Sequence, residues 1–210
     1  MRVLGFTAGC VALLLAWCGA FEHVASGAFS AHMLAHMTVV VVASPLMAFA
    51  ISGTRFDPVV QAPRVFSPLL ASLAELVVVW AWHTPRLHRF AREVPVGSML
   101  EQGMFLGCGL WLWIAAFGGG SRARGERGAQ GAVSLLLTCM HMTLLGALIA
   151  LPQRTLFGHA GHCHECVLSP LEDQQLGGAI MILAGGMAYM VGGLALVIEL
   201  LRGPATREVA

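Results

Sequence analysis

Long apolar runs are the feature that most restricts how this chain can fold. A helix of roughly 20 mostly apolar residues crosses a bilayer core of about 30 Å. Six such segments occur, separated by Gly, Pro and Arg: residues 3–20, 31–51, 67–84, 97–117, 131–152 and 176–201. Because the runs are continuously apolar instead of alternating, helices are favoured over a membrane barrel. The sequence predicts an all-α, polytopic transmembrane helical bundle, with residues 1–210 as one integral membrane domain.

The first apolar segment has two interpretations. Met1-Arg2, the apolar run to Trp17 and the small residues Cys18-Gly19-Ala20 fit a retained helix, which we favour. The same pattern also fits a signal peptide with a small-residue cleavage site. Both interpretations leave residues 21–30 on the same side of the membrane.

The arginines predict the orientation of the bundle. The chain has no lysine, and its net charge of +1 does not suit a nucleic-acid binder. Eight arginines fall at the two termini and in residues 52–66 and 118–130, whereas four fall on the opposite side. By the positive-inside rule, both termini are therefore expected to be cytoplasmic. Residues 118–130, rich in Gly and Arg, are expected to form a flexible cytoplasmic connector.

On this topology the histidines gather at the outer side of the membrane. Eight of the nine histidines are assigned to the outer half of the membrane or to the outer loops, and none to a cytoplasmic loop. His32 and His36 stand four residues apart at the outer end of the second segment. On a helix they share one face and could bind one metal ion. A pair of interfacial histidines satisfied by water is the alternative.

Two further side chains could complete that site. His83 ends the third segment at a similar depth, after Trp80 and Trp82, which suit an aromatic belt. Glu101 lies inside the fourth segment, where a carboxylate needs protein, a cation or water beside it. An uncoordinated histidine and a carboxylate that reaches the interface are the alternatives.

Two polar residues lie deeper in the predicted membrane. His141 is near the middle of the fifth segment, where a hydrogen-bonded core histidine and a functional ligand or relay are both open interpretations. Glu75, in the third segment, could face the bundle interior, but no partner can be named from the sequence.

The fifth loop holds the densest set of metal-binding residue types. These residues are His159, His162, Cys163, His164 and Cys166. Thiolate and imidazole together suit Cu(I) or zinc. Since an outer compartment is oxidising, a disulfide between Cys163 and Cys166 is the other interpretation. The remaining four cysteines are expected to be small core residues.

Several of these motifs, in this order, resemble the CtaG family of cytochrome c oxidase assembly factors. The resemblance covers about residues 29–201. It is carried by HMLAHM with Pro45 downstream, by WAWHTPRL, by Glu101 with Trp111 and Trp113, and by SPLEDQQLGGAIM at 169–181. The last motif is the most specific.

The resemblance implies a membrane protein that helps to mature a heme-copper oxidase. It points to His32, His36, His83, Glu101 and Asp173 as residues that handle copper, as Cu(I), with zinc as a possible alternative. The implied partners are cytochrome c oxidase subunits, a copper chaperone and the lipid bilayer. The implied location is the bacterial cytoplasmic membrane, with delivery at its outer face.

Because metal transfer needs no catalytic base, and no hydrolytic or phosphate-binding motif occurs, we expect no enzymatic activity. Two other functions stay open. The first is an intramembrane b-type cytochrome with heme held by histidines on facing helices. The second is a metal permease, which would need ligand residues along a path through the whole bilayer.

Overall fold

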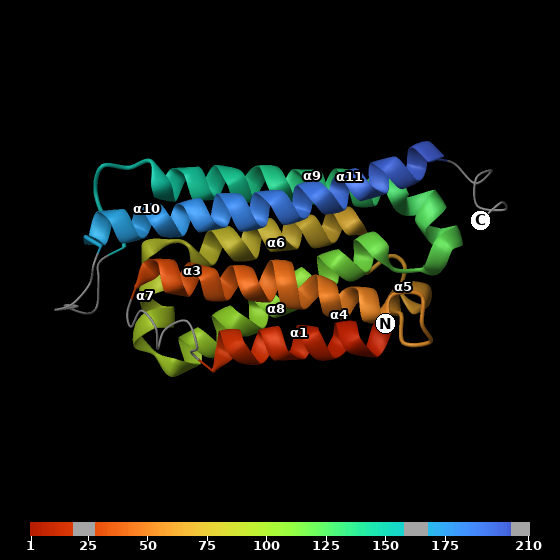
Figure 1. Cartoon of the computed structure of the whole chain (residues 1–210), viewed down its shortest axis with the longest axis horizontal. Helices are drawn as coiled ribbons and strands as arrows, with labels where there is room; N and C mark the ends of the chain where they lie inside the picture. The colour runs from red at the N-terminus through yellow and green to blue at the C-terminus, as the bar shows by residue number, and fades with distance from the viewer. Residues whose placement is uncertain (19–27, 158–167, 203–210) are drawn as a thin grey trace.

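The chain forms a bundle of long helices that lie lengthwise beside one another (Figure 1). The computed structural model describes residues 1–18, 28–157 and 168–202. The elements along the bundle are α1 (Arg2–Trp17), α3 (Phe29–Met37) continued by the π-helical turn η1 (Thr38–Ala43) and by α4 (Ser44–Ile51), α6 (Pro68–Trp82), α8 (Pro95–Phe117), α9 (Gly120–Ala150), and α10 (Pro170–Ile180) continued by η2 (Met181–Gly185) and α11 (Gly186–Arg202). Two short helices, α5 (Pro58–Gln61) and α7 (Pro85–Glu93), complete the described structure.

All six predicted segments are helical, and the described residues contain no strand, so the all-α prediction is confirmed. Four helical stretches are long and apolar enough to cross a membrane: Phe29–Ile51, Pro95–Phe117, Arg127–Ala150 and Pro170–Arg202. The other two segments correspond to the shorter apolar helices Arg2–Trp17 and Pro68–Trp82. The predicted bundle of about six segments therefore agrees with the structure.

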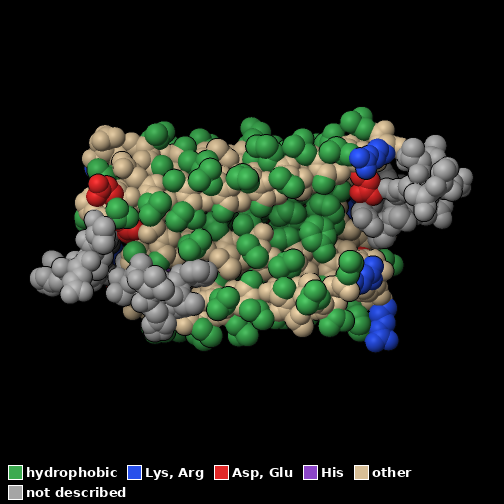
Figure 2. Space-filling model, viewed as in Figure 1, with side chains coloured by type: hydrophobic (Ala, Val, Ile, Leu, Met, Phe, Trp, Pro, Cys, Tyr) green, Lys and Arg blue, Asp and Glu red, His purple; other side chains and the backbone are tan. Residues whose placement is uncertain are grey.

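The outside of the bundle has the character expected for contact with lipid. Figure 2 shows hydrophobic side chains over the middle of the visible face, with charged side chains at its two ends. Exposed apolar side chains recur along single helices, such as Leu69, Leu73 and Val77 on α6. Several polar side chains are buried instead, among them Glu75 and Gln174 at 0% exposure. The bundle therefore presents apolar side chains outward and keeps these polar side chains inside the protein, as expected in a bilayer.

Proline and capping residues define where several helices begin. Proline stands in the first turn of α6, α7, α8 and α10, where its missing N–H leaves no helical hydrogen bond unmade. Ser169 and Glu172 form a capping box before α10, which starts the last span at Pro170. The observed span therefore begins six residues before the predicted start at residue 176.

The structure corrects the expectation of a flexible connector at residues 118–130. Gly119, with a φ of 84°, turns the chain, and α9 begins at the next residue. Arg, Ala, Glu and Gln in this stretch have good helix propensity, so the helix continues beyond the apolar segment. The fifth span is thus the end of a longer helix that extends out of the bundle.

A second difference lies between the third and fourth spans, where a loop was expected. Residues 85–93 form α7, with His88 and Ala91 buried and Arg86 and Arg89 exposed. Figure 1 shows α7 at the same end of the bundle as the first turns of α3 and α10, with α5 at the opposite end. We call the end of the bundle that holds α7 the α7 end, and the opposite end the α5 end.

Candidate functional site

Three buried side chains converge near the α7 end. His32 and His36 come from α3, and Glu101 comes from the first turns of α8. Each offers one ligand atom, and these atoms lie within 4.8 Å of one another. The three residues are only 4%, 1% and 1% exposed, respectively. Among the described residues, this triad is the group of metal-ligand types that meets at one point.

The distances inside the triad suit a small cation. Nε2 of His32 is 2.8 Å from Nε2 of His36. Nε2 of His32 is 3.4 Å from Oε2 of Glu101, and Nε2 of His36 is 3.5 Å from Oε1. Tetrahedral ligands at about 2.0 Å from a metal are about 3.3 Å apart. The carboxylate therefore already has ligand spacing, whereas the two imidazoles would separate by a few tenths of an ångström.

The spacing of the two histidines brings their rings together. Residues four apart on a helix share a face, and the His32 and His36 ring centroids are 4.1 Å apart. Phe105, one turn after Glu101 on α8, lies edge-on to His36 with centroids 4.5 Å apart. The π-helical turn η1 begins two residues after His36, and such turns often mark functional sites in helices.

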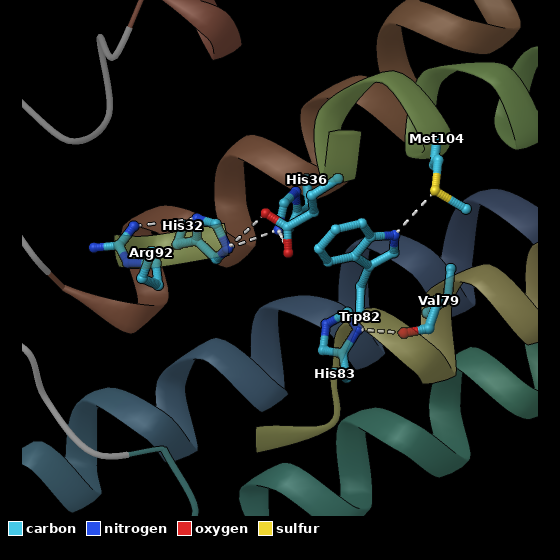
Figure 3. A network of polar contacts seen from close by, with 8 residues as sticks. His32, His36, Val79, Trp82, His83, Arg92 and Met104 are labelled. Atoms are coloured by element: carbon cyan, nitrogen blue, oxygen red, sulfur yellow. Dashed lines mark hydrogen bonds and ion pairs between the residues drawn. The ribbon is translucent and has the colours of Figure 1, made fainter. Parts of the chain in front are cut away.

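Arg92 of α7 approaches His32 from its other ring nitrogen, as Figure 3 shows. Its Nη1 is 3.3 Å from Nδ1 of His32. Because a guanidinium only donates hydrogen bonds, Nδ1 must accept, and the His32 proton is then on Nε2. That proton faces both Nε2 of His36 and the carboxylate of Glu101. In this arrangement the triad is a hydrogen-bonded group with Arg92 at one end.

His83 lies beside the triad instead of inside it. Its Nδ1 is 2.7 Å from the Val79 carbonyl oxygen, one turn earlier on α6 (Figure 3). Its ring centroid is 6.3 Å from that of His36. Its Nε2 is buried without a hydrogen-bond partner. His83 thus lies beside the triad, as its predicted depth suggested, but it is not one of the three side chains that converge.

Asp173 has a different position from the other predicted ligands. Its carboxylate accepts hydrogen bonds from the backbone N–H of Phe29 at 2.6 Å and of Ser30 at 3.1 Å, and from the Ser30 hydroxyl. These N–H groups belong to the first turn of α3, which has no earlier carbonyls to bond. Asp173 therefore joins α10 to the helix that carries His32 and His36.

The thioethers of α3 are directed away from the triad. A methyl group at Gly177 would lie 3.1 Å from Cγ of Met33, and one at Gly185 would lie 3.5 Å from Sδ of Met37. Both methionines are buried, at 0% and 3% exposure, against α10 and η2. Their position suits packing of the bundle, and the triad offers nitrogen and oxygen ligands.

His88 was not among the predicted site residues, yet it lies against them. Its ring centroid is 5.3 Å from that of His32 and 4.7 Å from that of Phe157. Burial lowers the pKa of His88 to about 4, so the imidazole is neutral at physiological pH. The signal in the sequence was the pair His88 and Arg92, four residues apart after Thr84-Pro85, which is a helix start.

The five predicted ligands of the fifth loop lie outside the described residues. They are His159, His162, Cys163, His164 and Cys166. Of the ten predicted site residues, five are therefore described, and three of these form the triad.

Comparison with known proteins gives a family match over nearly the whole chain. The family model described as cytochrome c oxidase caa3 assembly factor (Caa3_CtaG) matches residues 1–203. No curated protein and no solved structure matches the chain significantly. The family match includes the region of the resemblance at residues 29–201 and extends it to the first span.

Proposed function

The chain belongs to the family of cytochrome c oxidase caa3 assembly factors, and on that premise we propose that it holds copper for delivery to the oxidase core subunit. One observation supports a role in metal binding most directly. It is the convergence of His32, His36 and Glu101 within 4.8 Å in a buried part of the bundle. Copper is the cargo of this site, and the assembled oxidase is its destination.

The nitrogen and oxygen ligands of the triad suit copper or zinc. Imidazole binds copper and zinc well, and a carboxylate adds a negative charge that offsets the charge of the ion. Glu101 Oε2 is buried 3.4 Å from Nε2 of His32 without a hydrogen bond of good geometry, as expected of an oxygen that can bind a cation. We favour copper, as Cu(I), because a heme-copper oxidase needs it; zinc is the competing ion.

Delivery would take place at the outer face of the bacterial cytoplasmic membrane. The arginine bias favours cytoplasmic termini, which puts the α7 end on the outer side. Residues 159–166 belong to the loop that would then face outward, with three imidazoles and two thiols in reach of a copper chaperone. Copper would pass from that loop to the triad by exchange of ligands, without a catalytic base or enzymatic turnover.

The geometry of the two histidines favours a metal ion over heme. A heme held by two histidines needs them on opposite faces of the macrocycle, which facing helices supply. His32 and His36 come from one helix, and their Nε2 atoms are 2.8 Å apart. No macrocycle fits between them. The absence of a Soret band in the purified protein is the expected result.

A cell-based experiment tests the proposal. In cells carrying the double variant H32A/H36A, the oxidase polypeptide should be present while oxidase activity is lost. The matched control is L34A, because Leu34 lies on the same helix but is exposed; this variant should retain activity. Normal oxidase activity in H32A/H36A would refute the proposed function.

A further inference from the structure

The span that carries His32 and His36 has a proline in its interior, directly after the π-helical turn η1. Pro45 stands in the first turn of α4 and has no N–H to donate. The N–H of Ser44 bonds to the Val39 carbonyl oxygen, five residues earlier, instead of the Val40 oxygen, four residues earlier. The Val40 carbonyl therefore lacks the donor that an α-helix would supply from residue 44 and the donor that a π-helix would supply from residue 45.

The indole of Trp113 on α8 supplies the missing donor. Its Nε1 donates to the Val40 carbonyl oxygen at 3.1 Å. Val40 and Trp113 are only 1% and 3% exposed, so this bond is made inside the protein. The neighbouring carbonyl of Val39 also has a side-chain donor, the Ser44 hydroxyl at 2.8 Å. Both backbone oxygens of η1 are thus satisfied within the span, where a bilayer offers no other donor.

Trp113 belongs to the same row of α8 residues that forms the site. Glu101, Phe105, Gly109 and Trp113 follow one another at intervals of four residues, which puts them in one ridge along the helix. The first two residues of this ridge face His36, through the Glu101 carboxylate and the Phe105 ring. One ridge of α8 therefore contacts the second span both at the triad and at η1.

The two helices approach closely between these contacts. Both run from the α7 end towards the α5 end (Figure 1). A Cβ at Gly109 would lie 2.8 Å from Ser44 Oγ and 3.6 Å from the Val40 Cα. The backbone of η1 thus packs directly against α8, and Trp113 reaches it from the next turn of the ridge.

The π-helical form of η1 determines the direction of the two histidines. Each residue of an α-helix advances by about 100° around the axis. A π-helical turn holds an additional residue, because its hydrogen bonds join residues five apart instead of four. If η1 became α-helical, α3 would turn by about 100° relative to α4. His32 and His36 precede η1, so this rotation would take them away from Glu101.

We propose that Trp113 is a positioning residue for the metal site and acts through the Val40 carbonyl. Its hydrogen bond holds η1 in the π-helical form, and η1 in turn directs His32 and His36 at Glu101. The inference rests on the proposed function where it concerns copper. Its effect on the two imidazoles is measurable in the metal-free protein, so the two proposals can fail separately.

Nitrogen NMR of the metal-free full chain in detergent tests the positioning. The ring-nitrogen shifts of His32 and His36 report the contact between their Nε2 atoms, which are 2.8 Å apart. W113F keeps an aromatic ring but loses the donor, so these shifts should move away from the wild-type values. The matched control is W111F, because Trp111 also donates to a backbone carbonyl at 3.1 Å, that of Val65; here the shifts should stay. Wild-type shifts in folded W113F would overturn the proposal.

Titration with Cu(I), in competition with a chelator, measures the consequence for the metal site. In W113F the dissociation constant should rise by about 10–100-fold, as it does when groups that orient metal ligands are changed, while W111F should keep the wild-type value. S44A is the second variant if W113F does not fold, because it removes the other side-chain donor to η1; it should move the imidazole shifts as well.

The remaining outcomes separate the two proposals. A lower Tm of W113F with wild-type imidazole shifts and wild-type Cu(I) affinity would show a role in stability alone and refute the positioning. A wild-type chain that binds no Cu(I) would refute the proposed function, and the imidazole shifts of W113F would still decide the role of Trp113.

Discussion

The guanidinium of Arg92 lies 3.3 Å from Nδ1 of His32, the ring nitrogen that is not directed at Glu101. This contact fixes the His32 proton on Nε2, where a metal ion would have to bind. For His32 to bind a metal ion through Nε2, this proton must leave the ring or move to Nδ1. On Nδ1 the proton would face the N–H donor of Arg92. Arg92 therefore opposes metal binding through both its hydrogen bond and its positive charge.

Replacing Arg92 should strengthen copper binding. In R92Q the amide oxygen can accept from Nδ1–H of His32, so the metal-binding tautomer is no longer disfavoured. We expect the dissociation constant for Cu(I) to fall about tenfold, equivalent to about 1.4 kcal/mol. Competition with a coloured Cu(I) chelator measures it. R89Q is the control, because Arg89 is exposed on the same helix; weaker binding in R92Q would mean that Arg92 supports the site.

Asp173 should contribute to stability more than to metal binding. In D173N, one carboxylate oxygen that accepts from the first turn of α3 becomes an amide donor. We expect the free energy of unfolding to fall by about 1–3 kcal/mol, seen as a lower Tm in detergent, while Cu(I) stoichiometry stays unchanged. E172Q, at the neighbouring exposed position, should change the Tm less. Loss of the bound ion from folded D173N would make Asp173 a ligand.

Gly178 should tolerate no side chain, because α10 and α9 touch there through their backbones. A Cβ at Gly178 would lie 2.7 Å from both the Ala150 nitrogen and the Gly146 carbonyl oxygen. We expect G178A to lower the free energy of unfolding by about 1–3 kcal/mol, measured by thermal unfolding in detergent. G103A on α8 is the matched control, since nothing lies within 4 Å of that Cβ position. Equal stability of both variants would contradict this packing.

The bundle could be predicted from the sequence because a helix that crosses a bilayer needs a long apolar run, and such runs are visible in the sequence. The ends of the spans were less accurate, since capping at Ser169 and the helix propensity of the residues after Gly119 extend α10 and α9 beyond their apolar parts. The short helix α7 was missed because it is amphipathic and nine residues long. A search for apolar windows does not detect such a helix.

The core of the site could also be predicted, for two physical reasons. Helical spacing puts His32 and His36 on one face, and a carboxylate within a span must find a partner, which Glu101 does. The hydrogen bond of His83 to Val79 and the contact of Arg92 with His32 depend on ring orientation and helix packing. Neither ring orientation nor helix packing can be read from the sequence. The same holds for the hydrogen-bond partner of Glu75, which is Tyr189, 114 residues later in the chain.

The central claim is that His32, His36 and Glu101 together hold one copper ion. Titration of the purified full chain with Cu(I), in competition with a chelator, tests it most directly. H32A/H36A/E101Q should bind one Cu(I) fewer per chain than the wild type, while L34A should bind the wild-type number. If the triple variant binds the same number of Cu(I) ions with the same affinity as the wild type, the triad is not a copper site.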